Sequence, residues 1–243
     1  MERFRRIAGC LALATLLCWP TPVHAVQLRV YSASRHDRFT GFPDAPVWND
    51  AAWFDSRAFA GVGWSPADIG NKRQYALVSP QHAVCANHYL PDVGTTVRFL
   101  SVNGTVIDRI IASRTAVTND LDQDTDLALI RFTQPLLPTD EVPHFAYLDL
   151  PTEDAYLNTA LTVIGWQAKA GRGGILGFDD LEETTVNLTR VCRFDYSKTA
   201  GLGDDCYLRT GDSGSPSFAT VDGSPALIGI HTAVGSDTLF RYN

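Results

Sequence analysis

Short apolar segments separated by turn residues run along most of the chain. The segments are rich in Val, Ile, Thr and aromatic residues, and Gly, Pro, Asn and Asp separate them, without sustained helical periodicity or an internal repeat. This pattern predicts an all-β fold with strands over 75–79, 95–100, 105–112, 127–132, 160–166, 183–188, 215–220 and 226–232, and room for a closing strand within 238–242. A β-sandwich and a pair of β-barrels fit the pattern equally well.

The first 25 residues have a different pattern. Three arginines lie within the first six positions, an apolar run follows over 7–19, and the segment ends on small residues at Ala25. This order predicts a secretory signal peptide over 1–25. The alternative is a membrane anchor, but the apolar run is shorter than the roughly 20 residues that a spanning helix needs. The chain is therefore expected to be secreted, or periplasmic in a Gram-negative bacterium, with no membrane contact after signal removal.

A group of prolines interrupts the β pattern near the middle of the chain. They stand at positions 135, 138, 143 and 151, and such a segment is a natural connection between two halves. Residues 26–57 are richer in Arg, Asp, Pro and Trp and are predicted to form an N-terminal extension or propeptide. The remaining 58–243 is predicted to be one domain with two β units, over about 58–138 and 145–243.

Composition and charge limit the kinds of partner. Of the 243 residues, 45% are hydrophobic and 19% are charged, a balance typical of a globular protein. The formal charge of −7 becomes −9 when residues 1–25, with three arginines and one glutamate, are removed. An acidic chain is a poor candidate for binding nucleic acid. No nucleic-acid partner is expected, and the chain is expected to be a monomer.

Three cysteines remain after signal removal, and they are Cys85, Cys192 and Cys206. Export permits oxidation, and the last two enclose a short loop of the size for which loop-closure entropy gives about 3 kcal/mol. We therefore predict a disulfide between Cys192 and Cys206. Cys85 has apolar neighbours and is predicted to be a buried, inert free thiol.

A serine between two glycines is the clearest candidate for chemistry. It lies in the segment Gly211–Pro216, with the sequence GDSGSP, which leads into a predicted strand. A nucleophilic serine needs a base, a group that orients the base, and N–H groups aimed at the developing oxyanion. Gly211 and Ser213 are the candidates for those N–H groups. The alternative is a polar turn, because Gly, Asp and Ser are common turn residues.

This hexapeptide resembles the nucleophile segment of the trypsin-like serine peptidases of the chymotrypsin fold. Two upstream segments also match: 79–88 (SPQHAVCANH) is similar to the strand and turn that end in that family's catalytic histidine, and 124–130 (DTDLALI) is similar to its Asp-Ile-Ala-Leu segment. The order His, Asp, Ser is that of the chymotrypsin type. The resemblance covers roughly 58–235 and implies two antiparallel six-stranded β-barrels with the active site in the cleft between them.

The resemblance also implies a role for each residue of a triad. His88 is expected to be the base, Asp126 to orient it, and Ser213 to be the nucleophile. His88 is preferred over His82 because the family motif places its histidine after a pair similar to Ala86-Asn87. The implied reaction is hydrolysis of peptide bonds in polypeptide substrates through an acyl-enzyme, without a metal or a cofactor. A catalytically silent binding protein on the same fold and a broad-specificity esterase stay open as alternatives.

Alternating carboxylates over 120–126 are similar to the start of a calcium-binding EF-hand loop. Thr125 stands where that loop needs glycine, and Arg131 stands where it needs a bidentate glutamate. A solvated loop that leads to Asp126 is therefore the favoured interpretation, with a weak calcium site as the alternative, and no metal ligands are assigned.

The same resemblance points to the specificity residues. Members that cleave after Lys or Arg carry Asp where this chain has Tyr207, so basic specificity is not expected. The segment 229–234 resembles the edge strand that pairs with extended substrate. His231 matches the histidine with which glutamate-specific members bind an acidic side chain, and a buried strand histidine is an equally good interpretation. The residues expected to contact substrate are Tyr207, Thr210, His231, Thr232 and Ala233.

Many members of the family mature by a cut that frees an apolar N-terminus, which then pairs with the Asp before the serine. That Asp is Asp212 here. Arg38-Phe39 loosely resembles such a junction, so Phe39 is expected to supply the ammonium. Full activity of a chain that starts at Val26 would contradict this expectation.

Overall fold

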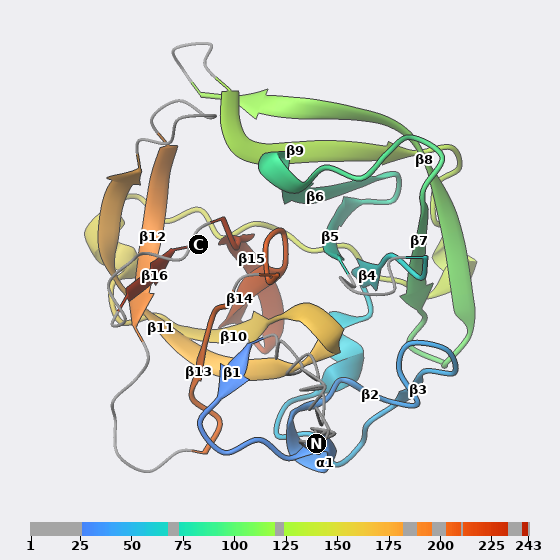
Figure 1. Ribbon diagram of the computed structural model, residues 1–243, viewed down its shortest axis with the longest axis horizontal. Helices are drawn as coiled ribbons and strands as arrows, with labels where there is room; N and C mark the ends of the chain where they lie inside the picture. The colour runs from blue at the N-terminus through green and yellow to red at the C-terminus, as the bar shows by residue number, and fades with distance from the viewer. Residues whose placement is uncertain are drawn as a thin grey trace, which may run out of the picture.

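Two β units arranged side by side make up the fold (Figure 1). The computed structural model describes residues 26–67, 73–119, 124–181, 189–195, 203–209, 211–232 and 240–242. Strands dominate these residues, which confirms the predicted all-β class. The helical elements are short, and they are the α-helix α1 (Ala33–His36) and the 3-10 helices η1 (Ser56–Phe59), η2 (Asn87–Tyr89), η3 (Pro138–Asp140), η4 (Glu153–Tyr156) and η5 (Trp166–Ala168).

The first unit is a closed antiparallel barrel in the order β4-β5-β6-β9-β8-β7. Successive side chains of a strand point to opposite faces, and alternate residues of β9 from Asp126 to Phe132 are buried while Arg131 between them is exposed. Asp126 therefore shares the inward face of β9 with apolar residues. The strands of this unit are β4 (Val62–Trp64), β5 (Gln74–Ser79), β6 (His82–Ala86), β7 (Thr96–Leu100), β8 (Val106–Thr118) and β9 (Asp124–Phe132).

The second unit is a six-stranded antiparallel sheet in the order β15-β14-β10-β11-β12-β16. Leu161, Val163, Ile175 and Ala219 are buried in its core. The expected closing strand is present as β16, which pairs with β12. The strands are β10 (Ala160–Ile164), β11 (Ala170–Leu181), β12 (Thr189–Asp195), β14 (Pro216–Val221), β15 (Ser224–Ile230) and β16 (Phe240–Tyr242).

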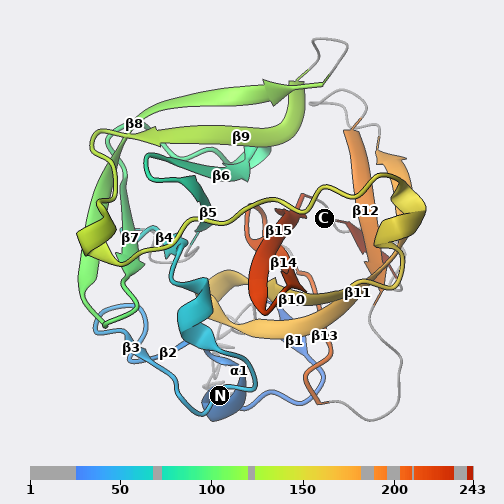
Figure 2. The ribbon, with the colours of Figure 1, turned by 180° about the vertical axis from the view of Figure 1, so that it is seen from behind.

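The two units share one hydrophobic core. Ala86 of β6 belongs to the same buried cluster as Ile164 of β10, Phe218 of β14 and Ile230 of β15. Phe145 lies on the connection between the units, and its ring centroid is 4.5 Å from that of Phe218. The connection crosses the back of the molecule (Figure 2). It therefore covers the seam between the units from that side.

The segment 26–57, predicted to be an extension or a propeptide, is folded into the domain. Arg38 is fully buried and donates to the carbonyl groups of Phe59 and Val62 at 2.8 and 3.0 Å, so it ties the segment to the first barrel. Besides α1, the segment contains β1 (Gln27–Leu28), which pairs with β13 (Cys206–Tyr207), and the hairpin of β2 (Phe39–Thr40) and β3 (Val47–Trp48).

The sequence pattern predicts several strands at the right positions, but it does not predict the glycine-rich strand β11. The predicted strands overlap β5, β7, β8, β9, β10, β14 and β15, and the predicted strand over 183–188 lies outside the described residues. The pattern does not predict β11 because residues 170–177 of this strand contain four glycines, which are unfavourable in isolated strands. Pairing with β10 on one side and β12 on the other overrides that local preference.

The predicted disulfide between Cys192 and Cys206 is wrong, because Cys206 is a buried free thiol. Cys192 pairs with Phe178 in the β11–β12 ladder, whereas Cys206 lies against Gly171, near the other end of β11. At about 3.3 Å per residue these two places on β11 are roughly 20 Å apart. A disulfide needs Cα atoms within about 7 Å of each other.

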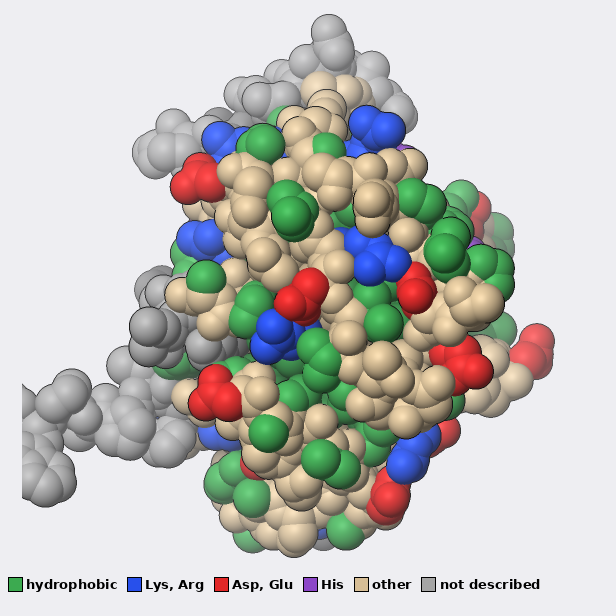
Figure 3. All heavy atoms as spheres, turned by 90° about the vertical axis from the view of Figure 1, so that its right-hand side faces the viewer, with side chains coloured by type: hydrophobic (Ala, Val, Ile, Leu, Met, Phe, Trp, Pro, Cys, Tyr) green, Lys and Arg blue, Asp and Glu red, His purple; other side chains and the backbone are tan. Residues whose placement is uncertain are grey.

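Acidic and basic side chains lie next to one another on the face that the first barrel turns outward (Figure 3). Two ion pairs of this barrel are Arg98–Asp108, with 2.8 Å between Nε and Oδ1, and Arg109–Asp140. Both signs of charge are therefore mixed on this face. Among the described residues, no helix is long and apolar enough to cross a membrane.

Candidate active site

The three residues of the expected triad come from separate parts of the fold. His88 lies in η2 directly after β6, Asp126 lies on the inward face of β9, and Ser213 lies in the loop before β14. β6 and β9 are paired, with Ala86 opposite Leu127, so the histidine and the aspartate are neighbours within the first barrel. The serine comes from the second unit, which places the group at the seam.

His88 lies within hydrogen-bonding distance of both partners. Its Nδ1 is 2.9 and 2.7 Å from the two carboxylate oxygens of Asp126, and its Nε2 is 2.9 Å from Oγ of Ser213. The backbone N–H of His88 also donates to Asp126 at 2.8 Å. The side chain of Asp126 is 3% exposed and that of His88 is 31% exposed. A base that is oriented by a buried carboxylate can take the proton of a hydroxyl on its open side.

Gly214 allows the serine loop to reach the first barrel. Its φ is +79°, and a Cβ at this position would lie 3.1 Å from the backbone nitrogen of Ala86, the last residue of β6. Its N–H donates to the carbonyl of His231 at 2.8 Å, which fastens the loop to the end of β15. Glycine is therefore required here for its backbone conformation and for its lack of a side chain.

The serine loop offers two backbone N–H groups to a ligand. The loop N–H groups that donate to carbonyl groups of the protein are those of Asp212, Gly214 and Ser215. Within the described part of the chain, the N–H groups of Gly211 and Ser213 donate to no other group. Gly211 has φ +106°, a conformation open only to glycine. Two available N–H groups beside a nucleophile are the arrangement that stabilises an oxyanion.

The carboxylate of Asp212, next to the serine, is buried. It accepts hydrogen bonds from the backbone N–H groups of Trp166 at 2.9 Å and Arg209 at 2.7 Å, and its oxygens lie 3.1 and 3.0 Å from the backbone nitrogen of Val26. Burial raises the pKa of Asp212 to about 6, although these N–H groups oppose the rise. The buried charge is therefore only partly compensated by these groups.

Val26 occupies a fitted site in the core of the second unit. Its side chain is 2% exposed and lies in the same buried cluster as Leu161 and Val163. Gly165 provides the space, because a Cβ at that position would lie 1.8 Å from Cγ2 of Val26. Gly165 has φ −124°, which any residue can adopt. The missing side chain is therefore what this position requires.

The expected activation junction at Arg38-Phe39 is wrong. Phe39 is 2% exposed, and its ring centroid lies 4.9 Å from that of Trp48 and 5.3 Å from that of Trp64. The peptide bond between the buried Arg38 and Phe39, at the start of β2, is closed to a processing enzyme. The backbone nitrogen that meets Asp212 is that of Val26.

The residues expected to bind substrate take different positions. Tyr207 donates its hydroxyl proton to the side chain of Gln27, in the N-terminal strand. Thr232 donates its hydroxyl proton to the carboxylate of Asp126. One of these residues is therefore tied to the start of the chain and the other to the triad. Two further residues, Thr210 and Ala233, lie outside the described residues.

His231 is a buried residue directly after β15. Its side-chain Nε2 lies 2.9 Å from Oγ of Ser217, and the residue is 2% exposed. Its backbone N–H donates to the carbonyl of Ser215 at 2.8 Å, so the histidine lies against the nucleophile loop. Burial lowers the pKa of His231 to about 3, so its ring is neutral at pH 7.

No group of three or more His, Cys, Asp and Glu side chains that could hold a metal ion is found among the described residues. Residues 120–123 of the acidic run that resembles a calcium loop fall outside the described residues, and Asp124 is described at backbone level alone.

Three residues that support Asp212 are not predicted from the sequence, and they are Val26, Gly165 and Trp166. All three are distant in sequence, and Val26 is separated from Asp212 by 186 positions. One local signal was available: an aliphatic residue directly follows the predicted signal-peptide cleavage site. Gly165 and Trp166 have no distinctive pattern in the sequence, because their roles depend on the residues that pack against them in the fold.

Gly214→Ala is expected to lower the rate at which a fluorophosphonate modifies Ser213 by about 100-fold, because the added Cβ pushes the loop away from Ala86 and the hydroxyl away from His88. Gly223→Ala is the matched control, since Gly223 also has φ +79° but a Cβ there meets nothing within 4 Å. Both variants carry a backbone strain of about 1–2 kcal/mol. Equal labelling rates in the two would contradict the close-approach argument.

The chain was compared with known families and structures. The sequence matches the Trypsin family over residues 72–241. None of the curated protein sequences matches the chain. Among solved structures, the NS6 protease from murine norovirus 1 is similar over 76% of this chain and 89% of its own, with 14% identity and a TM-score of 0.48. The Rv3671c protease in an inactive form is similar over 76% of this chain and 84% of its own, again with 14% identity and a TM-score of 0.48. The family match spans more than half of the sequence, and the chain therefore belongs to the Trypsin family.

Proposed function

We propose that this protein is a secreted serine endopeptidase with Ser213 as its nucleophile. The observation that carries the proposal is the position of His88, whose two ring nitrogens lie within hydrogen-bonding distance of Asp126 on one side and of Ser213 on the other. A protein that only binds a partner has no need of a carboxylate, an imidazole and a hydroxyl linked in this sequence by hydrogen bonds. The close contact of the histidine with the serine favours an enzyme over a silent member of the family.

In the proposed reaction, Ser213 Oγ attacks the carbonyl carbon of the scissile bond while its proton passes to Nε2 of His88. The N–H groups of Gly211 and Ser213 stabilise the tetrahedral oxyanion. Collapse breaks the C–N bond, His88 gives its proton to the leaving amine, and an acyl-serine remains. Water then attacks the ester with His88 as base, which releases the acid and restores the serine. Asp126 orients the ring and stabilises its protonated form.

Ser213→Ala is expected to abolish both labelling by a fluorophosphonate and cleavage of a peptide library, because the attacking oxygen is lost. His88→Ala should lower both rates by at least about 10⁴-fold. His82→Ala is the control for the base, since Nδ1 of His82 lies 2.8 Å from Oγ of Ser79 in the β5–β6 turn. Labelling that persists in Ser213→Ala would contradict the proposal, and turnover of esters without peptides would favour the esterase.

The proposed specificity is for an acidic residue before the cleaved bond. Support comes from His231, the histidine that holds the nucleophile loop through Ser215 and Gly214. A neutral imidazole can donate a hydrogen bond to a carboxylate, and the nearby negative charge favours uptake of a proton by the ring. Because the pKa of His231 starts at about 3, this uptake becomes less favourable as the pH rises. The preference for glutamate should then weaken with increasing pH.

His231→Leu is expected to remove a preference for Glu over Gln of about 10-fold or more in kcat/KM, which is the scale of one hydrogen bond to a charged group. The measurement is cleavage of matched Glu and Gln peptides between pH 5 and 9. His144→Leu makes the same change at an exposed position and should leave the preference unchanged. Equal turnover of the two peptides by the unmodified protein would rule out the acidic pocket.

In this proposal a single cut after Ala25 both removes the export signal and matures the protein. Residues 1–25 are a signal peptide, and the cut after Ala25 turns the amide nitrogen of Val26 into an ammonium group. That nitrogen lies about 3 Å from both oxygens of the buried Asp212, at 3.1 and 3.0 Å. The cut therefore supplies the missing counter-charge. The fitted site for the Val26 side chain beside Gly165 supports this assignment.

Chains that start at Val26 and at Ala25 are expected to differ in stability in a pH-dependent way. In the uncut form, the pKa of Asp212 is about 6 when folded and 3.8 when unfolded. The folded state therefore binds more protons, and its stability falls by roughly 3 kcal/mol as the pH rises through this window. A free ammonium at Val26 removes that loss, so the difference in melting temperature should be small at pH 4 and large at pH 7.5.

Asp212→Asn is the control for this experiment, because it removes the titrating carboxylate. In that background the two chains should have the same pH dependence. A pH-independent difference between the Val26 and Ala25 forms of the unmodified protein would contradict the proposed maturation.

A further inference from the structure

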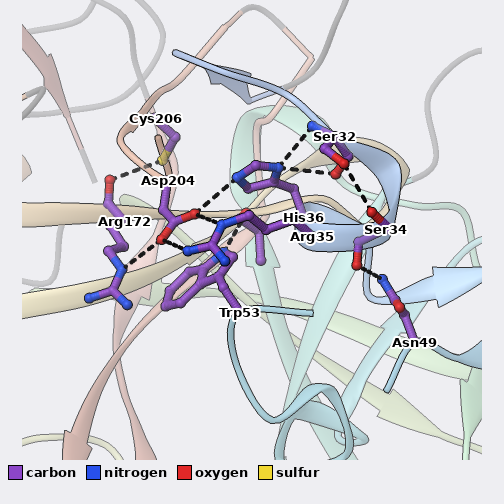
Figure 4. Close-up of polar contacts among 10 residues, drawn as sticks. Ser32, Ser34, Arg35, His36, Asn49, Trp53, Arg172, Asp204 and Cys206 are labelled. Carbon is purple, nitrogen blue, oxygen red and sulfur yellow. Dashed lines mark hydrogen bonds and ion pairs between the residues drawn. The ribbon is translucent and has the colours of Figure 1, made fainter. Parts of the chain in front are cut away.

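Three basic side chains surround Asp204, which lies two residues before β13 (Figure 4). Arg35 donates to both carboxylate oxygens, from Nε at 2.6 Å and from Nη2 at 2.8 Å. Nε2 of His36 lies 3.2 Å from one oxygen, and Nε of Arg172 lies 3.4 Å from the other. Asp204 is fully buried and His36 is 1% exposed. The Arg35 and Arg172 side chains are 52% and 44% exposed, so this is an ionic cluster around a buried carboxylate, and the proposed triad chemistry does not use it.

The cluster joins the N-terminal helix to the second unit. Arg35 and His36 belong to α1, whereas Arg172 belongs to β11. Nδ1 of His36 lies 3.0 Å from the backbone nitrogen of Ser32, at the start of the helix. The imidazole ring therefore spans the distance from the helix start to the carboxylate. Asp204 is the point at which these elements meet.

The strand β1 lies between this cluster and the nucleophile loop. Its residues Gln27 and Leu28 pair with Tyr207 and Cys206 of β13, and the N–H of Arg29 donates to the carbonyl of Asp205, directly after the cluster, at 2.9 Å. Val26 directly precedes β1, at the end of the strand away from Arg29, and its backbone nitrogen lies against Asp212. A change in the position of α1 relative to Asp204 would be transmitted along this short strand to Val26.

The energetics favour a positioning role over a purely stabilising one. The carboxylate of Asp204 loses its hydration on burial, and this cost offsets much of what the ion pair with the half-exposed Arg35 contributes to stability. It does define one geometry, since a bidentate arginine-carboxylate pair fixes both distance and orientation. Burial opposes ionisation of Asp204, but the hydrogen bonds and charges around it outweigh that effect and its pKa lies below the usual range. The carboxylate is therefore charged at neutral pH and available to hold α1.

We propose that Asp204, held by Arg35 and His36, is a positioning residue that fixes β1 against β13 and so keeps the α-amino group of Val26 at Asp212. The inference rests on the proposed maturation at Val26. It assigns a role to residues that lie outside the triad and outside the substrate-binding segment.

Asp204→Asn in the exported, processed protein tests the proposal with two measurements. The first is the rate at which cyanate carbamylates the Val26 α-amine, followed by mass spectrometry of the peptide 26–29 at a temperature where the protein is folded. The second is the rate of fluorophosphonate labelling at Ser213. Loss of one charged partner from the cluster is expected to speed carbamylation and to slow labelling by about 10-fold each.

Asp108→Asn is the matched control. Asp108 also accepts two hydrogen bonds from one arginine, Arg98, at 2.8 Å each, but it lies on the first barrel. Both rates should stay within about twofold of the unmodified protein, since an exposed pair contributes little. Arg35→Lys keeps the charge and should give rates between those of the unmodified protein and Arg35→Gln.

Unchanged amine reactivity in folded Asp204→Asn would overturn the inference. If that variant does not fold, equal rates in Arg35→Lys and Arg35→Gln would overturn it instead. A wild-type amine as reactive as that of a free peptide would also do so. Failure of the proposed peptidase function has a different signature: fluorophosphonate would not label the unmodified protein, while protection of the Val26 amine would still be measurable.

Discussion

The buried carboxylate of Asp212 governs the conformation around the nucleophile. A charge removed from water is costly unless other groups compensate it. Backbone nitrogen atoms of Val26 and Trp166, both distant in sequence, and of Arg209, three residues before, converge on this carboxylate. These contacts fix the loop that carries the neighbouring Ser213. Ser213, the proposed nucleophile, is therefore positioned by Val26 and by the turn after β10 as much as by the residues next to it.

A second constraint follows from the division of the proposed triad between two units. His88 and Asp126 are held within the first barrel, while Ser213 belongs to the second sheet. Their geometry survives only if the units keep a fixed relative position, and the shared core around Phe218 provides this because packed interiors deform little. Gly214 then brings the serine loop within contact distance of β6. The site is thus a property of the packing between the units.

The features that can be predicted from the sequence are those that short segments determine by themselves. The triad candidates stand in short segments where strand pattern and motif agree, and the inward position of Asp126 follows from strand alternation. The failures concern pairings between distant segments. The loop length between Cys192 and Cys206 says nothing about their separation along β11, and Arg38-Phe39 has the composition of a processing site but is buried by Trp48 and Trp64. Strand register and burial depend on contacts between distant segments, so they are known only from the folded structure.

The same distinction explains the segment 26–57. Its composition differs from the β pattern of the rest, which suggested a part that could be removed, yet its contacts reach both units. Val26 meets Asp212 in the second unit, and Arg38 donates to carbonyl groups at the edge of the first. A segment with this double attachment cannot be released without loss of support for the nucleophile loop. The maturation we propose therefore places the cut at the beginning of the segment, where one amide becomes an ammonium group beside a buried carboxylate, rather than at its end.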